Sequence, residues 1–194
     1  QIAASYKGEI ISADSRQVYR RMDIGTGKDI EEYKVEGKTI PYHLIDIVEP
    51  GVKYHLGQFQ LDFIAAFNQI ILNESLPILC GGSGLYLETA IAGQSFLGIE
   101  KNKDLRAELE NFSDAELSAK INNIDDEIID ILTVQTRERK IRAIEIHEYL
   151  TAHSNHKAVK TPAITSCIIG INIDREIRRE KITKRLRLRL KEGM

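Results

Sequence analysis

Apolar and polar residues alternate along the first half of the chain in a pattern that predicts strands and helices in turn. Residues 9–12, in the stretch GEIISADSRQVY, and residues 42–50 suit strands. Apolar residues spaced three and four apart predict a helix over 55–74, and the apolar run 75–82, stopped by two glycines, predicts a buried strand. A helix closed by glycine is expected over 83–93. This alternation predicts an α/β fold with a parallel sheet.

The second half of the chain changes character. Residues 100–150 carry four helical patterns and no convincing strand, which predicts a helical insertion. A polar connector over 151–162 is followed by a predicted strand over 163–173 and a basic helix from Asp174 onward. The expected domains are a discontinuous α/β core, residues 1–97 and 160–194, and a helical insertion, residues 98–159.

Composition narrows the class of protein. Apolar residues make up 42% and charged residues 29% of the 194 residues, which is typical of a globular protein. No apolar run reaches the length of a membrane span, and no signal peptide opens the chain. The two cysteines, Cys80 and Cys167, lie in apolar stretches, so we expect buried thiols and a reducing cytosol. No cysteines and histidines have zinc spacing.

The net charge of −2 conceals an asymmetry. Residues 98–135 hold ten acidic and four basic side chains, a charge of −6, whereas residues 174–194 hold nine basic and four acidic side chains, a charge of +5. The basic segment indicates either a polyanionic partner or a solvated helix face.

Candidate chemistry lies at the ends of predicted strands, where ligands bind in open parallel sheets. Asp14 follows the first strand and is either a helix N-cap or a catalytic base. The glycine-rich turn 81–84 precedes a helix and is either a tight turn or a phosphate site, with Ser83 as a cap or a ligand. Arg139 and Arg142 share a helix face, where they bind phosphate or pair with nearby glutamates, Glu138 and Glu145.

Four stretches together resemble the tRNA dimethylallyltransferases, also called tRNA isopentenyltransferases. They are GEIISADSRQVYRRMDIGTGK, YHLIDIVEP, LPILCGGSGLYLETAIAG and RERKIRAIEI, and the match is weakest across 110–135. The resemblance implies a P-loop NTPase-like α/β core, with a parallel sheet flanked by helices and a helical insertion that grips the anticodon arm of tRNA. It implies transfer of a dimethylallyl group from dimethylallyl diphosphate to the exocyclic amine of the adenosine adjacent to the anticodon. We expect a cytoplasmic monomer with no membrane partner.

The resemblance also assigns roles to matching residues. Asp14 matches the general base, and Ser83 stands near the reacting centre where threonine is more common. The residues expected to hold the flipped target base are Asp14, Ser15, Arg16 and Gln17. Further tRNA contacts are expected from Arg106, Glu138, Arg139, Lys140, Ile141 and Arg142. The diphosphate is expected near Arg142 and Arg185.

One departure from the family is large, because the glycine-rich loop that ends in Gly-Lys-Ser/Thr does not occur in the sequence. We expect that loop just upstream of Gln1, with QIAASYK as the end of the helix that follows it. The 194 residues are therefore interpreted as part of a longer protein, and a chain that truly began at Gln1 is expected to be inactive. The expected cofactor, Mg²⁺, is bound through the upstream loop and the diphosphate, with no metal ligand in these residues.

Three other interpretations stay open at this point. An adenylate isopentenyltransferase has the same fold and a free nucleotide as acceptor, although the helical insertion argues against a small acceptor. A P-loop nucleotide kinase is a second alternative, and a non-catalytic RNA-binding remnant is a third.

Overall fold

The chain folds as two compact units, and each is described by itself. The computed structural model describes residues 1–23, 25–93, 96–153 and 161–191. The first unit comprises residues 1–91 and 162–194, and the second comprises residues 92–161.

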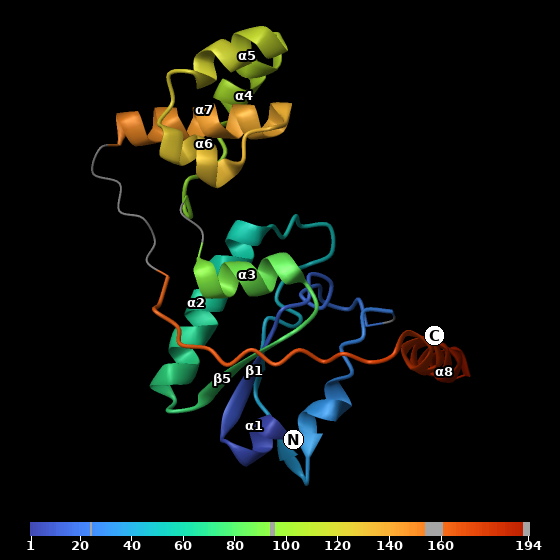
Figure 1. Ribbon diagram of the computed structural model, residues 1–194. Coiled ribbons are helices and arrows are strands. Elements are labelled where there is room, and N and C mark those ends of the chain that lie inside the picture. Colours follow the sequence, from blue (N-terminus) through green and yellow to red (C-terminus); the bar gives the residue numbers. More distant parts are fainter. Residues whose placement is uncertain (24, 94–95, 154–160, 192–194) are drawn as a thin grey trace. The chain divides into compact units, whose positions relative to one another are not determined.

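A three-stranded parallel sheet with the order β4-β1-β5 organises the first unit (Figure 1). β1 (Gly8–Ser12) is the middle strand and pairs with all of β5 (Leu76–Cys80). β4 (Tyr42–His43), on the other side, pairs through only two residues. The parallel α/β arrangement expected from the sequence is confirmed.

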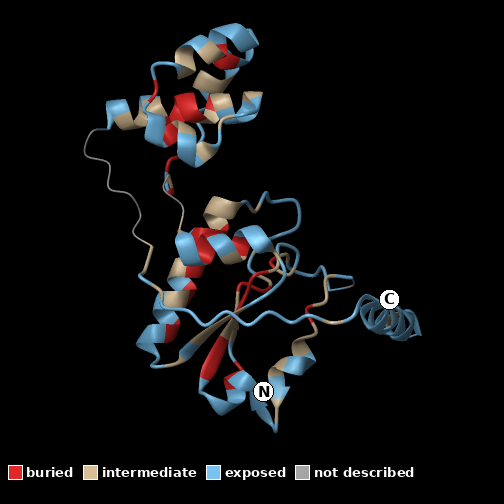
Figure 2. Ribbon diagram, viewed as in Figure 1, coloured by how far each residue is buried: buried red, intermediate tan, exposed pale blue. Residues whose placement is uncertain are grey.

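Two helices cover one face of this sheet. α2 (Leu56–Leu72) begins at His55, whose Nδ1 accepts a hydrogen bond of 3.1 Å from the Gln58 backbone N–H. α3 (Gly84–Ala92) follows β5, and both helices match the predicted ranges. Their apolar sides and the inward side of β1 form one core, which Figure 2 shows as buried segments of all three elements. The buried members of this core are Ile11, Ala13, Leu44, Phe59, Phe63, Ala66, Ile70, Tyr86 and Ala90.

The opposite face of the sheet is covered less completely. It meets α1 (Ile2–Ser5), the 3-10 helix η1 (Ile30–Tyr33) and the antiparallel hairpin of β2 (Lys34–Val35) and β3 (Lys38–Thr39). An open hollow remains there, lined by residues that include Ile10, Tyr33, Ile40, Ile78 and Cys80.

The prediction of a buried strand over 75–82 was right about the strand and wrong about its burial. β5 is the edge strand of the described sheet, its two end residues are exposed and its middle is half-buried. Cys80 and Cys167 are both free and exposed, so the expected burial of the thiols was also wrong. An apolar strand without an outer neighbour buries only the side chains that face the helices.

The predicted strand over 42–50 ends after two residues. Leu44 and Asp46 have φ angles of 63° and 57°, in the left-handed region that a strand does not tolerate. The chain therefore leaves the sheet at Leu44, and Val48 forms only an isolated parallel bridge with Tyr19, outside the sheet.

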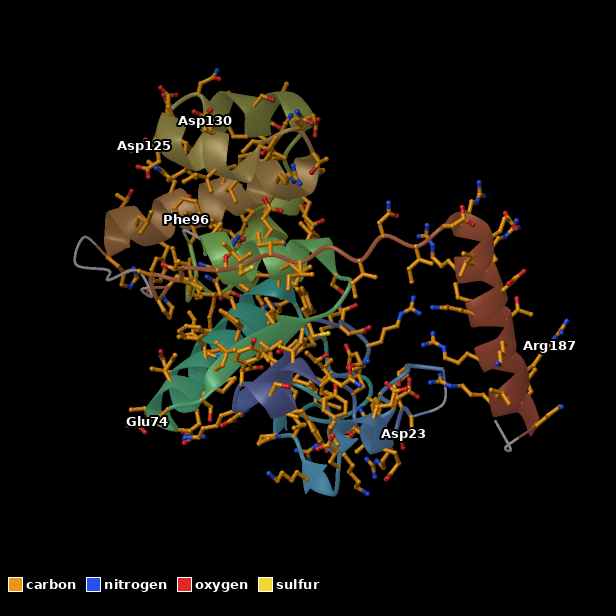
Figure 3. The ribbon with its side chains drawn as sticks, turned by 60° about the horizontal axis from the view of Figure 1, so that its bottom comes forward. Asp23, Glu74, Phe96, Asp125, Asp130 and Arg187 are labelled. Atoms are coloured by element: carbon orange, nitrogen blue, oxygen red, sulfur yellow. The ribbon has the colours of Figure 1, made fainter. Side chains whose placement is uncertain are left out.

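The predicted strand over 163–173 does not form, because no described strand lies beside it to complete its hydrogen bonds. Ile168 and Ile171 are 78% and 86% exposed, so the apolar pattern is present without the burial that usually accompanies it. The basic helix that follows is confirmed as α8 (Arg175–Lys191), which has no buried residue. Arg187 projects from this helix (Figure 3).

Within its described residues, the second unit is a bundle of four helices, as the pattern over 100–150 predicted. They are α4 (Lys103–Glu110), α5 (Asp114–Ile121), α6 (Asp126–Leu132) and α7 (Arg137–Ala152). α5 begins with a reciprocal capping box between Ser113 and Glu116. The buried residues of its core are Ile99, Leu109, Leu117, Ile124, Ile128, Ile141, Ala143, Ile144 and Ile146. Most of the predicted connector 151–162 lies outside the described residues.

No helix among the described residues is both long enough and apolar enough to cross a bilayer.

A hydrogen bond between the buried Glu9 of β1 and His43 of β4 joins the two neighbouring strands. Glu9 is buried, and its Oε2 lies 2.8 Å from Nε2 of His43, while its Oε1 accepts a hydrogen bond of 3.1 Å from the side-chain amide of Asn73. Burial alone would raise the pKa of Glu9, but hydrogen bonds from His43, Asn73 and Ser75 outweigh it and lower the pKa below the ordinary 4.5.

We expect Glu9→Gln to destabilise the first unit in a pH-dependent way. A carboxyl with a lowered folded-state pKa stabilises the fold above pH 4.5 and loses this contribution as the pH falls through the folded-state pKa. The variant should therefore lose about 1–3 kcal/mol of unfolding free energy near neutral pH and much less in acid. Urea denaturation at a series of pH values measures the difference, with the exposed Glu88→Gln as control. A deficit that does not change with pH would contradict the expectation.

We expect Gly81→Ala and Gly82→Ala to behave very differently. A Cβ at Gly81 would overlap the backbone oxygen of Ala13, whereas a Cβ at Gly82 would have no atom within 4 Å. Because the obstacle at Gly81 is backbone, Gly81→Ala must move the turn away from β1, at a cost of about 1–3 kcal/mol. Thermal denaturation of both variants checks this, and equal melting temperatures would show that the two strand ends are not packed so closely.

Candidate functional site

The carboxyl ends of β1 and β5 lie against each other and bring two predicted site residues together. The backbone N–H of Ala13 donates to the Cys80 carbonyl at 2.8 Å, and the backbone N–H of Ser83 donates to the Ala13 carbonyl at 3.3 Å. Asp14 and Ser83, both half-buried, therefore flank one short backbone junction. The parallel register of the two strands creates this arrangement.

Asp14 is held through one of its two carboxylate oxygens. Its Oδ1 accepts hydrogen bonds from the backbone N–H groups of Arg16 and Gln17, at 2.8 and 3.4 Å. This is the geometry of a capping residue, although the residues that follow form turns and not a helix. Among the described residues, Oδ2 has no hydrogen-bond partner and remains available as an acceptor.

The side chains after Asp14 differ in their freedom. Ser15 and Arg16 are exposed. The amide of Gln17 is engaged at both ends, because Ser12 Oγ donates to its Oε1 at 2.8 Å and its Nε2 donates to the Gly27 carbonyl at 2.9 Å. In this structure Gln17 therefore braces the loop between β1 and Lys28.

A buried lysine fixes the far end of the same loop. The ammonium group of Lys28 donates to the Tyr19 carbonyl at 2.8 Å and to Asp23 at 2.7 Å, and it forms a short ion pair with Asp46. Burial alone would lower the pKa of Lys28, but Asp23 and Asp46 raise it, so the group stays charged. Lys28 was not predicted as a structural residue, because its burial depends on which loops meet and leaves no signal in the sequence.

Two stacked aromatic rings belong to the same core as Ala13 of the junction. The ring of Tyr86 in α3 stacks on Phe59 in α2 with a centroid distance of 3.9 Å. Burial, followed by the nearby Tyr19 and Asp14, raises the pKa of Tyr86, so this phenol stays neutral beside the Asp14 carboxylate. The aromatic groups next to the Asp14 carboxylate are therefore uncharged.

The cations of α7 belong to the second unit, and most of them bind the protein itself. Arg139 is exposed and donates to the Thr133 carbonyl at 3.0 Å, and Lys140 donates to Ser118 Oγ at 2.9 Å. Arg142 donates to the Ile99 carbonyl at 2.6 Å and contacts Glu145 at 3.4 Å. The pairing of Arg142 with Glu145, one of the two sequence-based alternatives, is therefore present.

Arg106 of α4 forms an ion pair with the buried Glu145 of α7. Its Nε and Nη2 both donate to the carboxylate of Glu145 at 2.7 Å, in the bidentate geometry that arginine favours. These hydrogen bonds raise the pKa of Arg106. Glu145 itself was considered only as a partner in the sequence analysis, although a charged residue four positions after the buried Ile141 signals a buried carboxylate.

The remaining predicted site residues are placed as follows. Glu138 is exposed at the start of α7, and Arg185 is exposed on α8. Ile141 is buried in the core of the helical unit, so its side chain packs inward. The roles assigned to these residues stay predictions.

The described residues contain no group of three or more His, Cys, Asp or Glu side chains placed to hold a metal ion.

Comparison with known proteins gives one consistent result. The family model described as IPP transferase matches residues 17–194. The tRNA dimethylallyltransferase 2 of Phocaeicola vulgatus is 51% identical over 99% of this chain, and the tRNA dimethylallyltransferase 1 of Parabacteroides distasonis is 50% identical over 100%. In both cases the chain spans 62% of the relative's length.

Solved structures agree with this result. The crystal structure of a tRNA delta(2)-isopentenylpyrophosphate transferase from Staphylococcus epidermidis matches 99% of this chain and 64% of its own, with 29% identity and a TM-score of 0.56. A eukaryotic dimethylallyltransferase acting on tRNA matches 75% of this chain and 36% of its own, with 25% identity and a TM-score of 0.59. These likenesses and the parallel sheet confirm the predicted P-loop NTPase-like fold. The chain belongs to the IPP transferase family, together with proteins named tRNA dimethylallyltransferase.

Proposed function

We propose that the full-length protein transfers a dimethylallyl group from dimethylallyl diphosphate to the exocyclic amine of the adenosine adjacent to the anticodon of tRNA. The observation that carries this proposal is the junction of β1 and β5, which sets the free oxygen of Asp14 beside the turn of Ser83. Family membership and the names of the relatives support the same reaction. The chain spans less than two thirds of these relatives, so the activity of the whole protein is argued from this part.

The chemistry requires a base at a defined position. The exocyclic amine of adenine is a poor nucleophile because its lone pair is delocalised into the ring. As nitrogen bonds to the allylic carbon, the carbon–oxygen bond to diphosphate breaks, and one N–H proton passes to Asp14 Oδ2. Because Oδ1 is already held by two backbone N–H groups, the carboxylate is oriented before the base arrives.

The surroundings of Asp14 suit an extruded base. Arg16 and Ser15 are exposed beside it, and Ser83 offers a hydroxyl from the neighbouring turn. The glycine turn before α3 allows close approach, and the N-terminal end of this helix favours the negative charge of the departing diphosphate.

Arg185 and Arg142 are proposed to contact the diphosphate. Mg²⁺ is proposed to accompany the diphosphate and to neutralise part of its charge.

The helical unit is proposed to contact the anticodon arm through Arg106 and the stretch from Glu138 to Arg142. The acidic character of residues 98–135 limits the RNA surface to these cations, because phosphates avoid uncompensated carboxylates.

We further propose that the protein acts as a monomer in the cytoplasm, where its tRNA substrate is made and used.

We expect Asp14→Asn in the full-length protein to reduce prenyl transfer by about a hundred- to ten-thousand-fold while tRNA still binds. Asparagine keeps the oxygen that accepts the Arg16 and Gln17 N–H groups, but it cannot accept the substrate proton. The measurement is single-turnover transfer of labelled dimethylallyl groups to unmodified tRNA at saturating substrates.

The same assay separates the alternatives. If Asp14 served only as a cap, the variant would retain its melting temperature and also its turnover, which would contradict the catalytic assignment. Transfer to AMP but not to tRNA would identify an adenylate isopentenyltransferase. Phosphoryl transfer without prenyl transfer would identify a nucleotide kinase, and tRNA binding without release of diphosphate would identify an RNA-binding remnant.

A further inference from the structure

Glu145 is a buried acid in a part of the protein that is proposed to bind RNA. It is 3% exposed, yet it lies on α7 among the cations of the predicted tRNA-contacting stretch. A buried carboxylate is costly unless it is fully paired, and an acid beside an RNA surface also repels phosphate. Its presence therefore requires an explanation.

Four hydrogen bonds converge on this carboxylate from three directions. Oε1 accepts from the backbone N–H of Asn102 at 2.9 Å and from Nε of Arg106 at 2.7 Å. Oε2 accepts from Nη2 of Arg106 at 2.7 Å and from Nη1 of Arg142 at 3.4 Å. The Glu145 carboxylate thus holds two guanidinium groups in place. The three side chains together, Glu145, Arg106 and Arg142, carry a net charge of +1.

The two guanidinium groups are fixed but not enclosed. The side chains of Arg106 and Arg142 are 21% and 22% exposed. Arg142 is also anchored by the carbonyls of Ile99 and Glu100, at 2.6 and 3.4 Å. Among the described residues, Nη1 of Arg106 has no hydrogen-bond partner, so part of this guanidinium remains available to an outside acceptor.

We propose that Glu145 is a positioning residue that presents Arg106 and Arg142 as one preformed site for a phosphate group of the RNA backbone. The inference rests on the proposed tRNA function and adds the residue that orders its cations. An arginine that is free in solution must lose rotamer freedom when it binds a phosphate. Arg106 has already lost this freedom, because the bidentate contact with Glu145 holds its planar group in place.

This proposal and simple electrostatics predict opposite effects of Glu145→Gln. If net charge alone determined binding, removal of an acid would strengthen the affinity for RNA. If Glu145 positions the arginines, its loss should weaken the affinity despite the gain in positive charge. Glu148→Gln provides a matched control, because Glu148 lies on the same helix and is exposed.

We expect Glu145→Gln in the full-length protein to weaken binding of unmodified tRNA by about tenfold and to lower the slope of log affinity against log salt by about one unit. Glu148→Gln should bind as tightly as the wild type or slightly more tightly, with an unchanged slope. Titrations over a range of salt concentrations measure both quantities. Circular dichroism and melting curves establish that the helical unit is folded. Binding by folded Glu145→Gln that equals or exceeds that of Glu148→Gln would overturn the proposal.

If Glu145→Gln fails to fold, Arg106→Gln serves as a second test. In Arg106→Gln, Glu145 keeps Arg142 and the Asn102 N–H as partners, so the fold should be retained. We expect the slope to fall by about one unit in Arg106→Gln, and an unchanged slope would overturn the proposal. Where Glu145→Gln does fold, adding it to Arg106→Gln should cost less than it costs alone, because Glu145 acts through Arg106. Prenyl transfer by the wild type tests the proposed function separately. If the wild type transfers the prenyl group while Glu145→Gln and Arg106→Gln bind tRNA as tightly as the wild type, only the positioning role is contradicted.

Discussion

The first unit depends on the parallel pairing of β1 with β5. Register fixes which residues leave the two strands side by side, and here it sets Ala13 against Cys80 and Gly81. The glycine permits a backbone approach that a Cβ would block, so the turn that carries Ser83 reaches the residue that carries Asp14. The proposed site, which takes a carboxylate from one loop and a hydroxyl from another, therefore depends on the pairing of these two strands.

The second unit depends on a different interaction, a buried carboxylate that joins two helices. Glu145 connects α7 to the start of α4 through the Asn102 N–H and the Arg106 guanidinium. Hydrogen bonds from charged groups offset the cost of its burial, and the apolar core around it excludes competing water. In both units, therefore, the proposed functional side chains are oriented by contacts that also stabilise the fold.

The sequence predicted correctly the helices that depend on local residue patterns. It predicted wrongly some strands whose formation depends on segments distant in the sequence. α2, α3 and α8 follow from apolar spacing, caps and charge, and all three formed as expected. The strand predicted from residue 42 stops at Leu44, because a positive φ leaves no reliable trace in an apolar pattern. Residues 163–173 have a strand-like composition but no neighbouring strand among the described residues. Asp14 was found because its position at a strand end is visible in the sequence, whereas the buried Lys28 requires knowledge of which loops meet.

The sequence-based alternatives assigned each polar residue either a structural or a chemical role. The structure shows that one side chain can take part in both, through different atoms. Asp14 uses Oδ1 to hold the loop, which leaves Oδ2 for a proton. Arg106 uses Nε and Nη2 to hold Glu145, and among the described residues Nη1 has no partner, which suits the proposed phosphate contact. Lys28, by contrast, is buried, and its ammonium group has three protein partners, so it is left with stabilisation alone. Asp14 and Arg106 therefore combine a structural contact with an atom that is open to the proposed ligand, whereas Lys28 has only the structural contacts.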